Sequence, residues 1–167
     1  MASRLPPVAR FVFMILEPIS LVAGCVVPFW NTQHFVALQL PSNEKGIAAP
    51  EMTQTERMLA LQLGNMFGLV SLIGLAILYG ASEMGVVRKY LAACAIGDVG
   101  HLWAVYTGMG HKRFFDMQTW NDYAWGSIGF TSFLLACRTL YLTGNLGQDS
   151  MEGGTRPLGG KQKRRLS

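Results

Sequence analysis

Three titratable side chains lie inside long apolar stretches of this sequence. Glu17 interrupts the stretch FVFMILEPISLVAGCVVPFW, and Asp98 and His101 interrupt the stretch YLAACAIGDVGHLWAVYTGMG. At the centre of a membrane helix, an ionisable side chain costs roughly 2.5–3.5 kcal/mol on insertion scales, so it usually has a buried partner or a function. These three residues are therefore the first candidates for chemistry.

Asp98 and His101 are three residues apart, which places both side chains on one face of a helix. An apolar environment raises the pKa of a carboxylic acid, so such a group can hold a proton near neutral pH. A neighbouring histidine can orient the carboxylate or accept its proton. Such a pair could protonate an epoxide, a double bond or a carbonyl group, while a second carboxylate activates water or guides a hydroxyl nucleophile.

Four apolar segments are long enough to hold these residues in a bilayer, because a membrane helix needs about 20 mostly apolar residues. They lie near residues 10–30, 58–80, 88–108 and 121–143. The chain is 50% hydrophobic and 14% charged, against about 25% charged in soluble domains. We predict an all-α integral membrane protein with a bundle of four transmembrane helices. The alternative is a soluble all-α protein, which the apolar residues on all faces of each segment disfavour.

The first segment could also be a secretory signal peptide. Its apolar run is long and contains Glu17-Pro18, and no small-residue cleavage site follows before Trp30. We therefore interpret it as a retained helix.

Cys25, Cys94 and Cys137 lie in different apolar segments without CxxC or Cys/His spacing, so we interpret them as small hydrophobic residues. We expect no metal and no cofactor.

Basic residues are distributed unequally between the two sides of the predicted bundle. One side has Arg4, Arg10, Arg88, Lys89, Arg156, Lys161, Lys163, Arg164 and Arg165, and the other has Lys45, Arg57, Lys112 and Arg113. The positive-inside rule then places both termini in the cytoplasm. We expect a cytoplasmic lead at 1–9, a membrane domain at 10–145 and a disordered basic tail at 146–167. The tail suits a lipid surface and not nucleic acid, because no aromatic residues are interleaved with its charges.

The rise of an α-helix predicts two polar layers in the bundle. Glu17 and Arg138 fall roughly 10 Å and 8 Å from the cytoplasmic side, where they could form a structural or a catalytic ion pair. A second layer opens toward the lumen and contains Gln62, Asn65, Asp98, His101, Asn121 and Asp122. In that layer, the amides could bind substrate or join helices, and Asp122 could be catalytic or cap the fourth helix.

Other local patterns concern the surroundings of these layers. Trp103, Tyr106, Trp120, Tyr123 and Trp125 could stabilise positive charge on a substrate or form an interfacial aromatic belt. The spacing Gly64-x-x-x-Gly68 is typical of closely packed membrane helices. Thr53 and Glu56 form the pattern of a capping box at the start of the second segment. The sequence HFVALQL could form a short interfacial helix.

The combined pattern resembles a family of small fungal four-helix membrane proteins. It comprises Glu17-Pro18, Gln62-Leu-Gly-Asn65, Asp98-x-Gly-His101-Leu, Trp120-Asn121-x-x-x-Trp125-Gly126-x-Ile-Gly129-Phe130 and Arg138. Similar proteins are encoded with polyketide or terpenoid pathways, and some are assigned as cofactor-free epoxide hydrolases or cyclases. The layout is more distantly similar to membrane terpene cyclases and to the sterol isomerase and sigma-2 receptor group. The sequence lacks the paired His and Glu of that last group.

The resemblance implies an enzyme of the endoplasmic reticulum membrane that opens epoxides on a hydrophobic natural product. Together with the polar layers, it leads us to expect catalytic roles for Asp98, His101, Glu17 and Asp122. The expected substrate contacts are Gln62, Asn65, Trp103, Tyr106, Asn121, Trp125 and Arg138. The alternatives are a terpene cyclase or sterol-type isomerase, and a non-enzymatic protein that binds a lipid or sterol. The expected partners are a hydrophobic small molecule and the lipid bilayer, with no nucleic acid, and a homodimer is possible.

Overall fold

The apolar stretches fold as long helices whose ends are set by local signals. The computed structural model describes residues 4–39, 51–147 and 149, and every regular element in them is a helix. Helix α4 (Gln54–Gly80) begins at the capping box that Thr53 and Glu56 form, which confirms the sequence prediction. Helix α5 (Met84–Met109) ends at Gly110, where a φ of 79° requires a residue without a side chain.

The first long helix contains a π-helical turn and two prolines. Its parts are α1 (Pro7–Phe11), the π-helical turn η2 (Val12–Leu16) and α2 (Glu17–Trp30). Pro18 has no N–H, so it cannot donate to the carbonyl of Met14, four residues earlier. The hydroxyl of Tyr79 in α4 donates to that carbonyl instead, at 3.3 Å. A neighbouring helix therefore satisfies the acceptor that the proline leaves open.

The last long helix also contains a π-helical turn. It consists of α7 (Asp122–Ala124), η4 (Trp125–Phe130) and α8 (Thr131–Leu142). The Asn121 side chain caps it by accepting from the backbone N–H of Ala124 at 2.8 Å. The predicted cap at Asp122 is therefore wrong, because Asp122 is already the first helical residue. Asn121 also donates to the carbonyl of Leu38 at 3.0 Å, which ties this helix start to α3.

Short helices connect the long ones at one end of the molecule. Helix α3 (Thr32–Leu38) follows α2 and confirms the short helix predicted from HFVALQL. Helix α6 (His111–Phe115) and the 3-10 helix η3 (Met117–Thr119) lie between α5 and α7.

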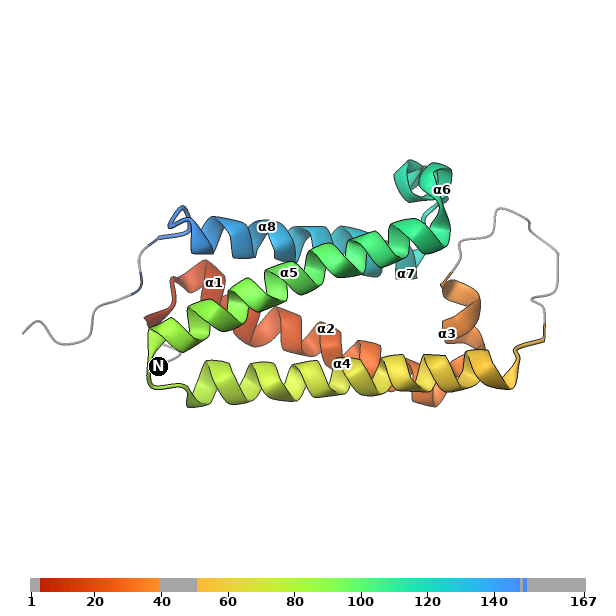
Figure 1. Cartoon of the computed structure of the whole chain (residues 1–167), viewed down its shortest axis with the longest axis horizontal. Helices are drawn as coiled ribbons and strands as arrows, with labels where there is room; N and C mark the ends of the chain where they lie inside the picture. Colours follow the sequence, from red (N-terminus) through yellow and green to blue (C-terminus); the bar gives the residue numbers. More distant parts are fainter. Residues whose placement is uncertain (1–3, 40–50, 148, 150–167) are drawn as a thin grey trace, which may run out of the picture.

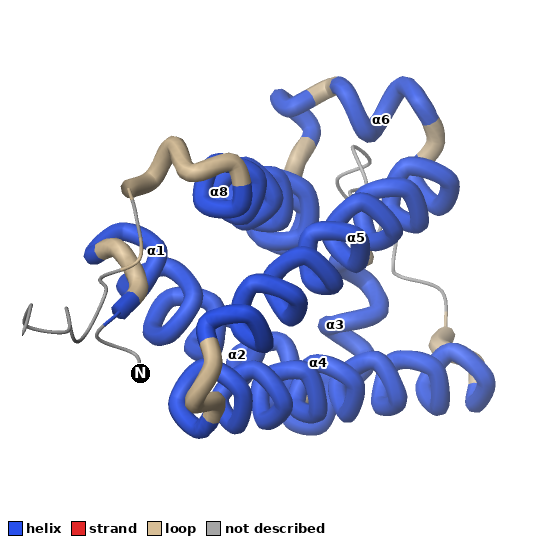
Figure 2. The backbone as a smooth tube through the Cα atoms, turned by 60° about the vertical axis from the view of Figure 1, so that its left-hand side comes forward, coloured by secondary structure: helices blue, strands red, loops and turns tan. Residues whose placement is uncertain are grey.

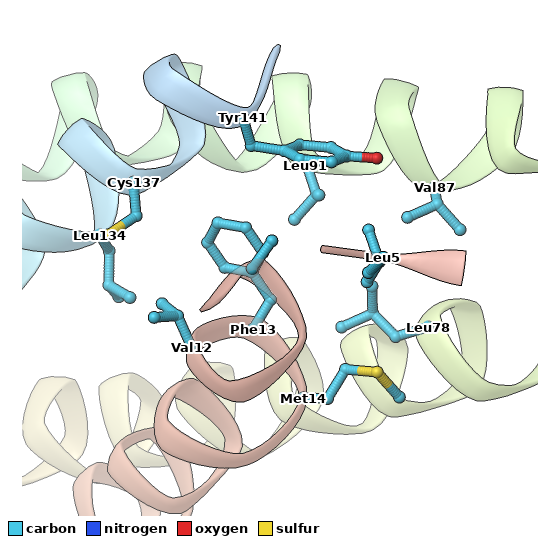
Figure 3. Packing of buried hydrophobic residues seen from close by; sticks show 11 residues of the cluster. Leu5, Val12, Phe13, Met14, Leu78, Val87, Leu91, Leu134, Cys137 and Tyr141 are labelled. Atoms are coloured by element: carbon cyan, nitrogen blue, oxygen red, sulfur yellow. The ribbon is translucent and has the colours of Figure 1, made fainter. Parts of the chain in front are cut away.

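The long helices form two pairs. Helix α2 packs along α4, and α5 packs along α8, while α4 and α5 meet much less extensively (Figure 1). Figure 2 shows the same pairs turned, with α1 lying between α8 and the end of α4. The largest apolar cluster joins the two pairs at this end (Figure 3). It contains Leu5, Ala9, Val12, Phe13, Met14, Leu78, Val87, Leu91, Leu134, Cys137 and Tyr141.

Glycines make the contact between α2 and α4 close. A Cβ atom on Gly64 would lie 3.0 Å from Pro28 Cγ and 3.1 Å from the carbonyl oxygen of Cys25. A Cβ atom on Gly68 would lie 2.9 Å from Cys25 Sγ, and one on Gly24 would lie 3.1 Å from the ring of Phe67. The predicted close packing at Gly64-x-x-x-Gly68 is therefore confirmed.

All four predicted apolar segments are helical. Among the described residues, two helices are long and apolar enough to cross a membrane, namely Pro7–Trp30 with 24 residues and Gln54–Gly80 with 27. This criterion uses length and composition alone. Most of the predicted tail at 146–167 and the first residues of the lead at 1–9 lie outside the described residues.

Candidate functional site

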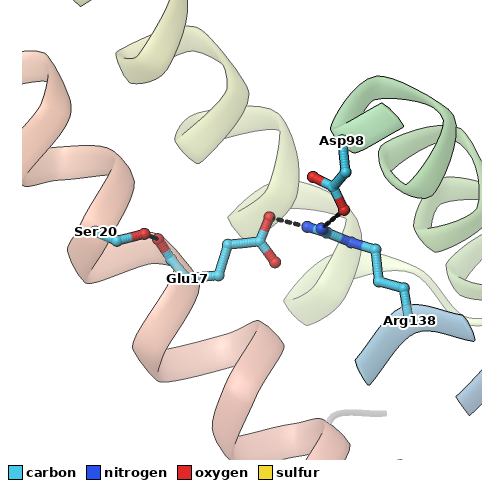
Figure 4. Close-up of polar contacts among 4 residues, drawn as sticks. All are labelled: Glu17, Ser20, Asp98 and Arg138. Carbon is cyan, nitrogen blue, oxygen red and sulfur yellow. Dashed lines mark hydrogen bonds and ion pairs between the residues drawn. The ribbon is translucent and has the colours of Figure 1, made fainter. Parts of the chain in front are cut away.

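Arg138 lies at the centre of a buried group of charges. Its guanidinium donates through one terminal nitrogen to Oδ2 of Asp98 and through the other to Oε1 of Glu17 (Figure 4). These three side chains, which we call the charged triad, come from α8, α5 and α2. Their exposed fractions are 1% for Arg138, 6% for Glu17 and 13% for Asp98. The predicted ion pair of Glu17 with Arg138 is confirmed, and Asp98 joins it.

The helix containing Glu17 is irregular where it reaches the charged triad. Glu17 directly follows the π-helical turn η2, and Ser20 donates to the backbone carbonyl of Glu17 at 2.7 Å. π-helical turns are rare and occur frequently at functional sites. The ring of Phe13, within the same turn, packs against the Arg138 guanidinium at 5.6 Å. This contact adds a cation–π interaction beneath the two ion pairs.

The charges of the triad do not balance when all three groups are ionised. Two carboxylates face one guanidinium, which leaves an excess of one negative charge. Within the described residues, Oε2 of Glu17 and Nε of Arg138 are buried without a hydrogen-bond partner. Oδ1 of Asp98 also accepts no hydrogen bond from these residues, but it is not among the buried atoms. Asp98 is therefore the less buried of the two carboxyl groups in the triad.

His101 extends the polar group by one helical turn. It interacts electrostatically with Asp98, as their spacing predicts. Its Nε2 lies 3.0 Å from Oγ of Ser127, which belongs to the π-helical turn η4. This hydrogen bond orients the ring, and Nδ1 forms no hydrogen bond within the described residues.

Sequence reasoning missed two further residues of α5 near the charged triad. Tyr90 and Cys94 are neighbours on α5, and Cys94 lies close enough to Arg138 for an electrostatic interaction. Residues 90, 94 and 98 are four apart, so they share one helix face with Asp98. That spacing could have revealed them. Gly74 of α4 makes room for Tyr90, because a Cβ atom there would lie 2.5 Å from the tyrosine hydroxyl.

The prediction of two separate polar layers is wrong, because Asp98 bonds to the residue assigned to the other layer. The number of residues from each helix end does not give the true depth, because α5 runs obliquely to the other helices (Figure 1) and the arginine side chain is long. The layers therefore merge at Arg138.

The two amides of the predicted second layer lie elsewhere. Gln62 and Asn65 are exposed on α4, and neither forms a hydrogen bond with Asp98 or His101 within the part of the chain that is described. They line an open groove of about 480 Å³, as do Phe29, Gln54, Arg57, Met58 and Leu61. The expectation that both amides share a face is met, but that face is not the one at the charged triad.

The remaining candidates gather toward the end of the molecule that holds α3, α6 and α7. Asp122 is exposed in the first turn of α7. Tyr106 lies about 12 Å farther along α5 than Asp98, and its ring contacts Trp103 at 5.7 Å and Phe114 at 5.4 Å. Trp125 packs against Trp120 at 4.9 Å. These aromatic rings contact one another, and Trp103 and Trp125 remain 66% and 51% exposed.

No group of three or more His, Cys, Asp or Glu side chains suited to a metal ion occurs in the described residues.

Residues 2–148 match the model of a family described as a domain of unknown function, DUF7704. The chain belongs to the DUF7704 family. The matched range includes Glu17, Asp98 and Arg138. No curated protein and no solved structure matches the chain. Family membership therefore assigns no reaction, and the geometry of the charged triad has to support any proposal.

Proposed function

We propose that this protein is a membrane-embedded enzyme that opens epoxides on a hydrophobic polyketide or terpenoid substrate by acid–base catalysis. The observation that supports the proposal is the charged triad, in which a guanidinium holds two carboxyl groups inside an apolar helical domain. In this proposal Asp98 is the catalytic acid. Glu17 and Arg138 are positioning residues that fix its carboxyl group.

The excess charge explains how an acid can persist at this place. Like charges in an apolar environment favour the protonation of one of them. One proton on the two carboxyl groups leaves a single carboxylate to balance Arg138. The two carboxyl groups share this proton, and Asp98, the more exposed of the two, is the one that passes it to a substrate.

The reaction needs no oxidant or reductant. Asp98 donates its proton to the epoxide oxygen while one carbon–oxygen bond breaks, and a water oxygen forms a new bond to that carbon. His101 accepts the proton that the water loses and returns it to Asp98, which gives a diol and the starting enzyme. When a hydroxyl group of the substrate replaces water, the same steps give a cyclic ether.

We further propose that four helices cross the membrane, with both termini in the cytoplasm. Two helices meet the length and composition criterion. The 26 residues of α5 span about 39 Å, which exceeds the roughly 30 Å of a hydrocarbon core. The last long helix runs beside α5. A lipophilic substrate would then reach Asp98 from the bilayer, as expected for a multi-pass protein of the endoplasmic reticulum.

Asp98→Asn tests the proposal because it removes the proton and keeps the side-chain shape. Microsomes containing the variant would be given an epoxy-polyene and a prenylated epoxide. We expect turnover to fall at least 100-fold, within the usual range for a lost general acid. Asp98→Glu should retain part of the activity. In a separate experiment in ¹⁸O-labelled water, the label in the product would indicate hydrolysis and its absence would indicate cyclisation.

Asp116→Asn is the matched control, because Asp116 lies in the connection between α6 and η3 and its carboxylate forms no hydrogen bond with the described residues. This control should keep full activity. Melting temperatures in detergent would show that Asp98→Asn still folds. Full turnover by a folded Asp98→Asn variant would disprove the acid role.

A further inference from the structure

The groove beside the start of α4 combines one cation, several amides and an apolar wall. Arg57 supplies the charge, and Gln54, Gln62 and Asn65 supply the amides. Phe29 of α2 lines the same groove, as do Met58 and Leu61. A cavity of about 480 Å³ lies within the usual range of roughly 300–1,000 Å³ for small-molecule sites.

Arg57 is available to a ligand. Its side chain forms no hydrogen bond or ion pair within the described residues. The adjacent carboxylate, Glu56, is engaged by Thr53, whose backbone N–H and hydroxyl donate to it at 2.7 Å and 2.8 Å. The groove also lies at the N-terminal end of α4, where the helix dipole favours negative charge.

The polar and apolar groups of the groove follow one side of α4. Residues 54, 57, 58, 61, 62 and 65 recur at the spacing of a helix face. The first and last of them are about 16 Å apart along the axis, which exceeds the size of an isolated phosphate or carboxylate group. A ligand that contacts Arg57 therefore has room for an apolar chain against Phe29 and Leu61.

We propose that this groove binds an anionic amphiphile, with its carboxylate or phosphate at Arg57 and its chain against Phe29, Met58 and Leu61. Gln54, one helical turn from Arg57, completes the contacts to the head group. The groove is formed by the ends of the two helices that meet the membrane criterion, so a lipid-derived anion could enter it laterally. This proposal is independent of catalysis at Asp98, which lies outside the groove.

Binding would be measured by equilibrium dialysis of radiolabelled probes against the purified full chain in dodecyl maltoside. The probes are oleate, oleoyl lysophosphatidate, oleyl alcohol and inorganic phosphate. We expect both anionic amphiphiles to bind at least tenfold more tightly than the alcohol, because a hydrogen bond to a charged group contributes about 1.5–3 kcal/mol. A preference for oleate or lysophosphatidate identifies the head group.

Arg57→Gln should weaken binding of the anions about tenfold or more and leave the alcohol unchanged. Arg113→Gln removes an exposed arginine of α6 outside the groove and should have no effect. Equal effects of the two variants would overturn the proposal, as would equal binding of alcohol and oleate. Binding of inorganic phosphate as tightly as lysophosphatidate would overturn the role of the chain. The Asp98→Asn variant should bind the anionic amphiphiles as tightly as the wild type. A loss of binding at the groove can therefore be told apart from a loss of the proposed enzyme activity.

Discussion

Helix α2 contacts its neighbours in two different ways. Along α4, it packs through small residues at a contact that we call the glycine seam, where Gly64 and Gly68 face Pro28 and Cys25. Toward α5 and α8, its polar link is Glu17, which is held through Arg138. The seam is apolar and extensive, whereas the polar link depends on ion pairs among three side chains.

The two contacts differ in what they contribute to the protein. Small residues at a helix contact let the two backbones approach closely and gain van der Waals contacts. A buried ion pair contributes little net stability, since desolvation of the charges offsets most of their attraction. The charged triad is therefore weak as a stabilising device. It fits the catalytic role that we propose for Asp98, while the glycine seam holds the two helices together.

Arg138→Met should have the largest effect, because it leaves two carboxyl groups without their cation. Removing one partner of a buried ion pair typically costs about 3–5 kcal/mol. We expect the free energy of unfolding in detergent to fall by that amount, measured by denaturant titration.

A variant without any of the three charges separates stability from chemistry. The triple variant Glu17→Gln, Asp98→Asn, Arg138→Met should recover most of the lost stability, because no unpaired charge remains. It should still lack turnover. If the triple variant is as unstable as Arg138→Met alone, the charged triad stabilises the fold and the contrast with the seam fails.

Gly64→Ala tests the glycine seam and should have the next largest effect. The added methyl group would meet Pro28 and the backbone carbonyl of Cys25, which cannot rotate away. Overpacking of this kind costs about 1–3 kcal/mol. Thermal unfolding monitored by circular dichroism would measure the loss.

Gly108→Ala is the matched control, because a Cβ atom at this position of α5 meets nothing within 4 Å. Alanine has the higher helix propensity by about 1 kcal/mol, so this variant should be as stable as the wild type or more stable. Destabilisation of equal size by both substitutions would show that the close contact at Gly64 does not cause the loss of stability.

The helices were predictable from the sequence because apolar length is a local property. The segments 10–30 and 58–80 appear as Pro7–Trp30 and Gln54–Gly80, and Thr53 marks the start of the second. The pairing of Glu17 with Arg138 was also predictable, since opposite charges in apolar helices at similar depth have few other partners.

The place of Asp98 was not predictable in the same way. It depends on how α5 crosses the other helices and on the reach of Arg138, which are properties of tertiary packing. The groove was missed for a related reason. Gln62 and Asn65 share a face, but the sequence does not say whether that face meets Asp98 or lies beside Phe29.

Tyr79→Phe should reduce stability less than Arg138→Met or Gly64→Ala. It tests a polar bond between α2 and α4. The variant removes the hydroxyl that donates to the Met14 carbonyl at 3.3 Å. A single hydrogen bond of this kind contributes about 1 kcal/mol. The decrease in unfolding free energy should therefore be about 1 kcal/mol, measured by denaturant titration.

Pro18→Ala shows whether that hydroxyl replaces the donor that the proline lacks. Alanine at position 18 has a backbone N–H that can donate to the Met14 carbonyl within the helix. In the Pro18→Ala background, Tyr79→Phe should therefore cost less than it does in the wild type. An equal cost in both backgrounds would mean that Tyr79 acts independently of the carbonyl. A reduced cost would show that this polar bond compensates for a local defect in α2.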